Sequence, residues 1–371
     1  MTRLAGSTRR HALLAGGAAV VVGGAGAAWL GTRRMGSMDG YEASAARLRA
    51  VLAAQPEVAD LVRYATLAPS GHNTQPWRFR PGADRIEVLP DVSRRTPVVD
   101  PDDHHLYVSL GGAAETLALA AAARGRPGEI VFDPAGPGGL IFSHVQGPAV
   151  ASALFEAIPV RQSTRADYDG RAVSAADLST LAAAARMPGV DVILITERHR
   201  ISGLRDLVIE GNTAQLADPA FVRELKSWIR FNPRRAMDTG DGLFSVASGN
   251  PPLPTWLGSV MFDATFKPKA ENDRYARQLD TSAGVAVFVG EREDRDHWTR
   301  VGRSSQRFAL QATALGLKIA HINQPVEVAA MRPELASLVG LAGRRPDLVM
   351  RFGYGPAMPY SVRRSLPTVI A

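Results

Sequence analysis

ATLAPSGHNTQPWRF, residues 65–79, is the stretch around which the rest of the chain is organised. Apolar residues at helical spacing precede it, and Pro69 forbids a further helical turn. Ser70, Gly71 and Asn73 follow; glycine permits a close backbone approach, and the polar side chains donate and accept hydrogen bonds. This polar loop between a helix and a strand is either an ordinary connector or a place to hold a flat, polar-edged ligand.

The same stretch resembles a flavin-contacting loop. Its pattern, Pro-Ser-x-x-Asn-x-Gln-Pro-Trp, is similar to that of the nitroreductase family, and the longer run APSGHNTQPWRF resembles the Acg-type subgroup most closely. Nine residues at fixed spacing make the motif specific. The resemblance implies an FMN cofactor that is contacted by Pro69, Ser70, Gly71, Asn73 and Gln75.

A second motif lies in mid-chain, where Arg161 and Arg165 bracket Ser163 in a loop before a helix capped by Ser174. Arginine presents a fixed fork of donors that matches phosphate oxygens, and a serine hydroxyl completes such a cradle. Two arginines near a serine also arise by chance in a chain this rich in arginine. In nitroreductases an Arg-Arg-Ser-x-Arg/Lys loop binds the flavin phosphate; here Gln162 departs from the second basic position.

The two motifs stand in the reverse of the family's usual order. Leu61–Arg124 and Leu178–Gly316 each contain a helix with an Ala-rich end, a strand, and a long Ala/Leu helix that closes at a glycine. The first carries the Pro-Ser-x-x-Asn loop. In the second half the counterpart of that loop, Ala185–Asp191, lacks the Ser and Asn.

Nitroreductases are usually intertwined homodimers in which each flavin site takes one loop from each subunit. The resemblance therefore implies an α+β, nitroreductase-like fold of two fused half-repeats. These would form an intramolecular pseudo-dimer with central sheets flanked by helices, one FMN per chain, and a monomer in solution. We place the first half at residues 39–150 and the second at 151–371.

Local patterns predict the main elements. They include a hairpin over residues 77–89, a buried helix from Asp100 to Arg124, and a strand over 284–290. Residues 232–254 are rich in Gly, Pro, Asn and Asp and predict a long irregular insertion. Acg-type proteins carry such an insertion over the flavin, so it resembles a lid. Its apolar underside, or equally its anchor in a core, would be Trp228, Phe231, Phe244 and Trp256.

Two further segments are assigned by resemblance. Asn323 and Gln324 follow a strand whose end passes along the flavin ring in the family, with backbone groups near the flavin N5. In the C-terminal tail a basic residue of the family reaches the phosphate. Either Arg363 or Arg364 would serve, and the sequence does not choose between them.

The N-terminus has the pattern of a targeting signal, residues 1–34. Paired arginines at positions 9 and 10 precede a weakly hydrophobic run from Ala12 to Ala28, which resembles a twin-arginine (Tat) export signal. That route exports folded proteins with their cofactor and implies the Tat machinery as a partner. Two alternatives stay open: an uncleaved membrane anchor, or a cytoplasmic protein that starts at Met35 or Met38.

Composition excludes several other functions. The 371 residues contain no cysteine, so disulfides, thiol catalysis and iron–sulfur clusters are ruled out. Five of the arginines that contribute to the net charge of +7 lie in the N-terminal segment. The remainder of the chain shows no dense basic run with interleaved aromatics, so no nucleic-acid partner is expected. His104 and His105 invite a metal, but neighbouring side chains on a helix point about 100° apart, and exposed first-turn residues explain them, so no metal is expected.

The resemblance to nitroreductases implies an FMN-dependent oxidoreductase that passes hydride from NAD(P)H to a nitroaromatic, quinone or similar acceptor. FMN supplies the redox chemistry, so no catalytic side chain is required. The alternative is a protein that holds FMN beneath a lid with little or no turnover, as has been suggested for Acg-type members.

Overall fold

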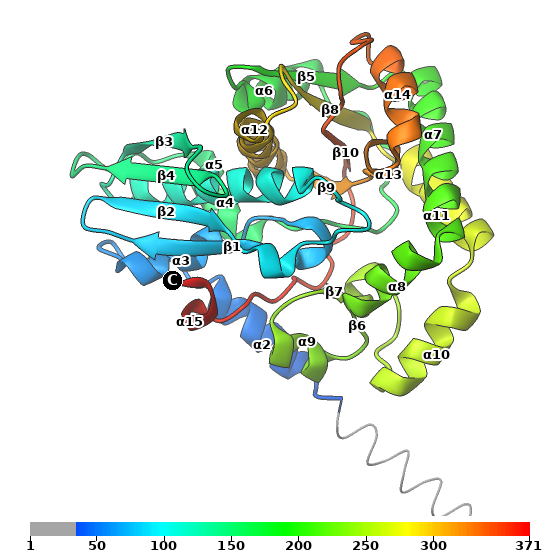
Figure 1. Ribbon diagram of the computed structural model, residues 1–371, viewed down its shortest axis with the longest axis horizontal. Coiled ribbons are helices and arrows are strands. Elements are labelled where there is room, and N and C mark those ends of the chain that lie inside the picture. The colour runs from blue at the N-terminus through cyan, green and yellow to red at the C-terminus, as the bar shows by residue number, and fades with distance from the viewer. Residues whose placement is uncertain (1–34) are drawn as a thin grey trace, which may run out of the picture.

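The computed structural model describes residues 35–371, and the predicted N-terminal signal lies outside the described residues. Two four-stranded sheets, one two-stranded sheet and their helices make up the fold (Figure 1). The first half follows the predicted hairpin and buried helix. Its elements are α2 Met38–Leu48, α3 Val58–Ala65, β1 Trp77–Pro81, β2 Arg85–Pro90, α4 His104–Ala122, β3 Gly128–Asp133, β4 Gly139–His144 and α5 Ala153–Ala157.

The second half repeats this series in the same order. A helix precedes its first strand, and Ser174 caps that helix by accepting a hydrogen bond from the Asp177 N–H (3.0 Å), as predicted. Its elements are α6 Ala175–Ala185, β5 Val190–Ile195, β8 Gly284–Gly290, α12 Arg295–Ala314, β9 Lys318–His321, α13 Gln324–Glu327, α14 Arg332–Leu338, β10 Leu348–Gly353 and α15 Leu366–Val369.

A large insertion separates β5 from β8 at the place where the first half has a tight hairpin. It is mostly helical, and the stretch 232–254, expected to be irregular, contains α9 and β7. Asn232 begins α9 by accepting a hydrogen bond from the Arg235 N–H (2.9 Å), which the Gly/Pro-rich composition concealed. The elements are α7 Arg198–Ala217, α8 Pro219–Ser227, β6 Ile229–Arg230, α9 Pro233–Thr239, β7 Leu243–Phe244, α10 Thr255–Thr265 and α11 Pro268–Asp280.

The two sheets have equivalent topologies. Their strand orders are β1-β2-β4-β3 and β5-β8-β10-β9, and every neighbouring pair within them is antiparallel. In each half a helix precedes the first strand, and a long helix joins the second strand to the third. The chain therefore contains the same α+β unit twice.

The long helices α4 and α12 cross where each has a glycine. A Cβ on Gly111 would collide with the carbonyl oxygen of Thr299, and a Cβ on Gly302 with that of Val108. Only glycine permits two helix backbones to approach this closely. The two contacts are mutual, so Gly111 and Gly302 mark equivalent positions of the two halves.

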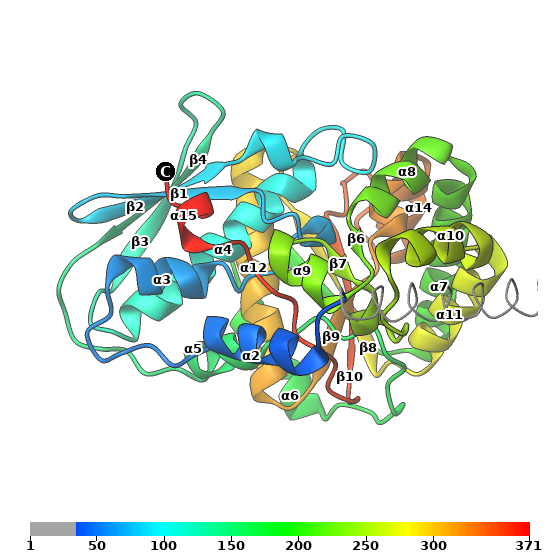
Figure 2. The same ribbon diagram turned by 90° about the horizontal axis from the view of Figure 1, so that it is seen from below.

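A continuous core joins the halves. Phe79 and Phe142 of the first sheet belong to the same apolar cluster as Phe288 and Phe352 of the second, with α4 and α12 between them. The C-terminal tail leaves β10 and crosses to the first half, where α15 lies beside β1 (Figure 2). There the Ala371 N–H donates to the Phe79 carbonyl (2.8 Å).

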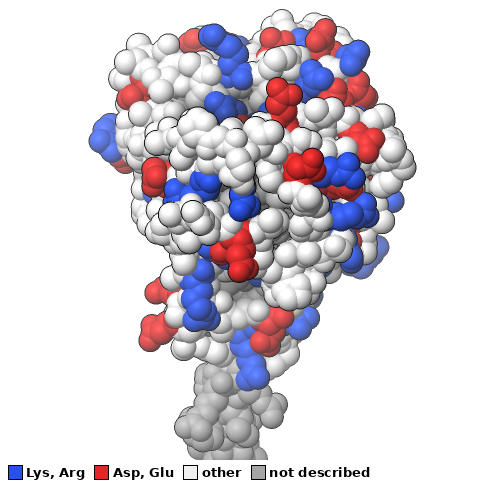
Figure 3. Space-filling view, turned by 90° about the vertical axis from the view of Figure 1, so that its left-hand side faces the viewer, with Lys and Arg blue, Asp and Glu red and all other residues white. Residues whose placement is uncertain are grey.

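Charged side chains are spread over the surface. On the face shown in Figure 3, basic and acidic residues are interspersed and do not form a single basic stripe. Within residues 35–371, no helix combines the length and the apolar character needed to cross a membrane.

Candidate functional site

The loop after α3 has an unusual backbone. His72, Asn73 and Gln75 have positive φ values of 48°, 55° and 54°, in the left-handed region that non-glycine residues rarely enter. Each such residue costs of order 1–3 kcal/mol and persists only where its surroundings enforce it. Here the Ser70 hydroxyl accepts a hydrogen bond from the Gln75 N–H (2.9 Å) and closes the loop.

Contacts with two distant segments hold this loop in place. The Asn73 amide donates to the carbonyls of Gly242 (3.1 Å) and Val362 (3.3 Å), and the Gln75 amide donates to that of Gly240 (2.8 Å). The insertion and the C-terminal tail therefore both fix the loop. Sequence alone offered no signal for either partner, because they lie more than 160 residues away.

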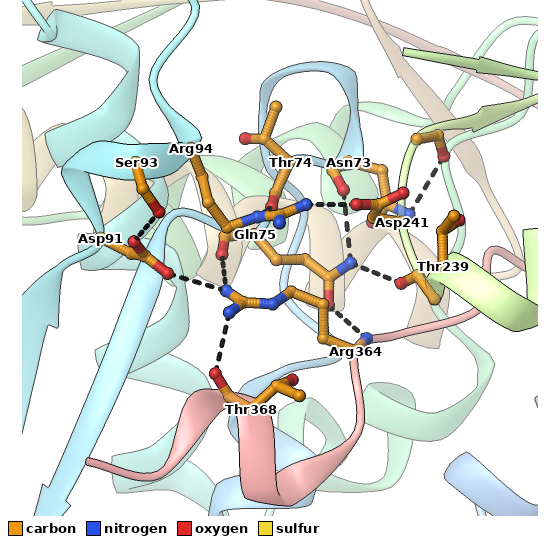
Figure 4. A network of polar contacts seen from close by, with 12 residues as sticks. Asn73, Thr74, Gln75, Asp91, Ser93, Arg94, Thr239, Asp241, Arg364 and Thr368 are labelled. Carbon is orange, nitrogen blue, oxygen red and sulfur yellow. Dashed lines mark hydrogen bonds and ion pairs between the residues drawn. The ribbon is translucent and has the colours of Figure 1, made fainter. Parts of the chain in front are cut away.

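Figure 4 shows the ionic part of this attachment. Arg94 donates to the Thr74 carbonyl and to the carboxylate of Asp241, which also accepts from Arg230 (2.6 Å). Burial pulls the pKa of Asp241 upward, but the hydrogen bonds from Arg230 and Arg94 outweigh it and hold the pKa below its usual range. A buried anion between two cations thus fastens the insertion to the loop.

A cavity of about 250 Å³ lies beside the loop, between the two halves and the insertion. Most of the residues predicted to bind the cofactor come together in its lining, although they derive from four separate segments. They are Pro69, Ser70, Gly71, Asn73, Arg161, Gln162, Ser163, Arg165, Asn323, Gln324 and Arg363.

Gln75 and Arg364, also predicted to bind the cofactor, lie outside this lining. They bind each other: the Arg364 N–H donates to Gln75 Oε1 (2.9 Å), and the Arg364 guanidinium donates to the Gln75 carbonyl (3.0 Å) and to Asp91 (3.2 Å). Of the two tail arginines it is Arg363 that faces the cavity. Gln75 and Arg364 therefore position the loop and the tail (Figure 4).

Two other predicted residues have side chains engaged in the scaffold. Gln162 accepts from the Met358 N–H and donates to the Met358 carbonyl (both 2.8 Å), so it ties the second motif to the tail. Asn323 accepts from the Val349 N–H (2.9 Å). The backbone around Arg165 is held by buried Arg351, which donates to the carbonyls of Thr164 (3.1 Å) and Ala166 (2.8 Å).

Three arginines gather at one end of the cavity: Arg49, Arg161 and Arg363. Within residues 35–371 they donate to backbone carbonyls and to no carboxylate; Arg161 and Arg363 share that of Leu67 (3.4 and 3.0 Å). Burial, followed by the charge of Arg49, lowers the pKa of Arg161 to about 10. Burial and the same neighbours lower that of Arg363 well below its usual value.

This cluster is suited to bind an anion. One terminal nitrogen of Arg161, Nη1, is buried and has no hydrogen-bond partner among the described residues. An unpaired buried cation is costly, and three together repel one another. Arg49, at the end of α2, was missed because nothing in an Arg-rich helix distinguishes one arginine from the next.

Three imidazoles also line the cavity and were not predicted: His72, His105 and His321. Burial, then the charge of Arg165, lowers the pKa of His72 to about 4, and burial, then Arg161, lowers that of His321 to about 3. They are neutral near pH 7 and offer both donor and acceptor nitrogens. Within the part of the chain that the structure describes, His72 Nδ1 is buried without a partner, as is the Oε1 of Gln324.

The insertion covers the cavity, but through other residues than predicted. Of the stretch 232–254, Leu243 reaches the lining of the described structure, and α7, α8 and the residues around α11 supply the rest of the cover. Of the two predicted roles of the aromatic residues, the anchor in a core is the one found for Phe244 and Phe231. Phe244 packs on Tyr41 (ring centroids 4.4 Å apart), and Phe231 is buried against α10. Trp228 and Trp256 lie outside the cavity lining.

The explanation of His104 and His105 as exposed first-turn residues is wrong. His104 is fully buried, and its Nε2 lies 2.8 Å from Asp347 Oδ1, while His105 lies 3.2 Å from the Asp347 carbonyl. Their rings are only 4.6 Å apart, and ligand atoms of both lie within 4.8 Å of Asp100. Asp100 already accepts from two N–H groups at the start of α4, and the prediction of no metal stays a prediction.

The position that matches Gly112 of the cavity lining carries a large side chain in the second half. Since Gly111 matches Gly302, Gly112 of the cavity lining matches Arg303. Arg303 and Arg307 both pair with buried Glu115, at 2.8 and 2.9 Å. A large ion-paired side chain thus occupies the position where the cavity has a glycine.

No protein-family model matches the chain. The protein described as "Putative NAD(P)H nitroreductase Rv3131" from Mycobacterium tuberculosis is 28% identical over 325 residues, which is 84% of this chain and 90% of that protein. A second M. tuberculosis protein, "Putative NAD(P)H nitroreductase acg", is 24% identical over 83% of this chain and 93% of its own length. The chain is thus a distant homologue of proteins described as nitroreductases.

Solved structures give looser matches. The FMN-dependent nitroreductase NfnB from Mycobacterium smegmatis, solved with NADPH, has a TM-score of 0.37 and 13% identity over 58% of this chain and 96% of its own. A nitroreductase with bound FMN from Bacteroides fragilis has a TM-score of 0.36 and 14% identity, with the same coverage.

Proposed function

We propose that this chain is an FMN-dependent oxidoreductase of the nitroreductase type, which takes hydride from NAD(P)H and passes it to a nitroaromatic, quinone or similar acceptor. The distant homology supports the class of reaction. The observation that carries the cofactor is the cluster of Arg49, Arg161 and Arg363 in a cavity with no carboxylate to pair them among the described residues.

The residues present fit FMN. The three arginines and Ser163 would hold the phosphate by charge-assisted hydrogen bonds. The unpartnered His72 Nδ1, which donates or accepts according to its tautomer, and Gln324 Oε1, which accepts, suit the polar edge of a ring system. When bound, FMN supplies the hydride chemistry, and the chain's own task is to orient it, neutralise the phosphate and limit access.

The two halves would form an intramolecular pseudo-dimer with one site. The equivalent sheet orders and the mutual contact of Gly111 and Gly302 support two fused half-repeats, with boundaries near residues 39–150 and 151–371. Arg303 fills the equivalent position in the second half. The proposal is therefore one FMN per chain and a monomer in solution.

A second candidate function is a flavin-holding protein with little turnover. The observation that favours it is the cover: α7, α8 and the residues around α11 line the cavity, and Gly240 and Gly242 are bound to the loop beneath. Export by a Tat-like signal, which we retain as a proposal, would favour it further, because nicotinamide cofactors are scarce outside the cytoplasm.

The deciding experiment is an anaerobic absorbance titration of the purified, FMN-loaded protein. Bleaching of the visible flavin band by NADPH indicates a reductase. Bleaching by dithionite but not by NADPH indicates the flavin-holding alternative. A protein that cannot be loaded with FMN contradicts both.

Deletion of residues 232–254 is a poor test of the cover. The deletion would remove the carbonyls of Gly240 and Gly242 and the Asp241 carboxylate, which hold the loop at Asn73 and Gln75. A sharper variant is Phe266→Ala, which removes a bulky side chain from the cover and leaves the attachment at Asn73 and Gln75 intact. If the cover limits access, this variant is reduced faster by NADPH, whereas Trp256→Ala on the exposed side of α10 behaves as the parent.

A further inference from the structure

The cavity has a second end, whose charge is opposite to that of the arginine cluster. Asp100, in the loop before α4, and Glu327, on α13, line it together with His105. Glu327 accepts a hydrogen bond from the Gln215 amide of α7 (2.6 Å). Within residues 35–371 no lysine or arginine pairs with Glu327, and burial raises its pKa.

An apolar wall from the insertion faces these acids. Leu216 of α7, Phe221 and Leu225 of α8, and Phe266 all line the cavity. Helix α8 is fastened to the loop that carries Asp100, because Glu224 accepts hydrogen bonds from the N–H groups of residues 98 and 99 (both 3.0 Å). The apolar wall and the acids therefore belong to one built compartment.

The titratable groups nearest Glu327 are Asp100 in the loop before α4, His105 at the start of α4, Glu224 on α8 and Tyr275 on α11. Arg165, a cation that also lines the cavity, lies near Tyr275. A cation does lie on α14: Arg332 donates to the Val326 carbonyl (2.7 Å) and is not part of the lining. Burial, followed by the charge of His104, lowers the pKa of His105, so that imidazole stays neutral near pH 7.

We propose that this end is the acceptor subsite, and that it admits flat, uncharged or cationic aromatic molecules while Glu327 and Asp100 exclude anionic ones. The inference rests on the proposed function, because it assumes that the arginine end takes the flavin phosphate. Like charges repel, so an acid that lines the subsite weakens the binding of an anionic ligand relative to a neutral ligand of equal shape.

Three probes of matched shape test the proposal: 4-nitrobenzyl alcohol, 4-nitrobenzoate and protonated 4-nitrobenzylamine. Their dissociation constants are measured by calorimetry on the oxidised, FMN-loaded full chain without an electron donor, so turnover plays no part. The alcohol binds, the amine binds at least as tightly, and the benzoate binds weaker by roughly tenfold or more. In Glu327→Gln the ratio of the dissociation constants of benzoate and alcohol, called the gap below, becomes smaller.

Glu210→Gln is the matched control, because Glu210 is an exposed acid on α7, outside the cavity lining. It retains the full gap. Protonation of Glu327 removes its charge, so benzoate binding in the parent strengthens as the pH falls, and it does so less in Glu327→Gln.

The failures are distinguishable. A parent protein that cannot be loaded with FMN contradicts the proposed function. Normal loading with equal affinity for alcohol and benzoate, no binding of any probe, or an unchanged gap in Glu327→Gln contradicts the acceptor subsite alone.

Discussion

At the scale of single residues, Arg161 lowers the stability of the ligand-free protein and favours the binding of an anion. Its buried Nη1 has no partner within residues 35–371, and Arg49 and Arg363 lie beside it with no acid in that part of the chain to neutralise them. Such a cluster destabilises the protein until an anion enters. Sites that are strained when empty and relieved by their ligand are common where binding matters more than stability.

Arg161→Met should therefore raise the midpoint of thermal unfolding of the FMN-free protein and lower the affinity of the protein for FMN. Loss of one charge-assisted hydrogen bond costs roughly 1.5–3 kcal/mol, or about ten- to a hundredfold in affinity. Differential scanning fluorimetry and a fluorescence titration measure the two effects. Arg171→Met, which changes an exposed arginine, should alter neither; equal FMN affinity in Arg161→Met would remove this residue from the site.

The buried imidazoles predict acid sensitivity. Their pKa values in the folded state, about 4 for His72 and about 3 for His321, lie below that of an unfolded histidine. The unfolded chain therefore binds protons that the folded chain refuses, and stability falls as the pH drops below about 6.5.

Between pH 7.5 and pH 5, we expect the free energy of unfolding of His321→Gln to fall by about 2 kcal/mol less than that of the parent. Chemical denaturation of the FMN-free protein measures this difference. The exposed His199 provides the comparison, since His199→Gln should follow the parent. An identical pH dependence of His321→Gln and the parent would mean that His321 is not held neutral.

At the scale of elements, the crossing of α4 and α12 decides how the halves meet. Gly302 and Gly111 each lie against a backbone carbonyl, which cannot move aside as a flexible side chain would. The added methyl of Gly302→Ala gains about 1 kcal/mol of helix propensity, but overpacking costs typically 1–3 kcal/mol and more against backbone.

Gly302→Ala should consequently lower the free energy of unfolding by about 2 kcal/mol, as a urea titration would show. Gly112→Ala is the matched control, because its Cβ would meet nothing closer than 3.7 Å, so that variant should be neutral or slightly more stable. Equal effects of the two substitutions would contradict the close crossing.

At the scale of the whole molecule, the asymmetry between the halves predicts the number of cofactors. The second half carries Arg303, paired with Glu115, at the position that matches Gly112 of the cavity lining, and its counterpart of the loop lacks Ser and Asn. We expect a ratio of FMN to protein near one, from absorbance after gel filtration, in a particle of one chain. A ratio near two would overturn this assignment.

Much of the fold could be predicted because its signals are local. The hairpin of β1 and β2, the strand β8 and the long helices α4 and α12 follow from periodicity and from glycine and proline, and the structure confirms them. The helix α9 was not predicted, because its residues have a composition typical of loops and a single capping residue, Asn232, begins it.

The amino-acid sequence by itself determined the two loops that line the cavity and the repetition of one unit, since the spacing of a motif and the order of elements are properties of neighbouring residues. Only the tertiary structure decided that Arg363 and not Arg364 faces the cavity, that Arg49 and three histidines join it, and that α7 and α8 form most of its cover. These assignments depend on which distant segments meet, and that is settled by packing, which leaves no periodic trace in the chain.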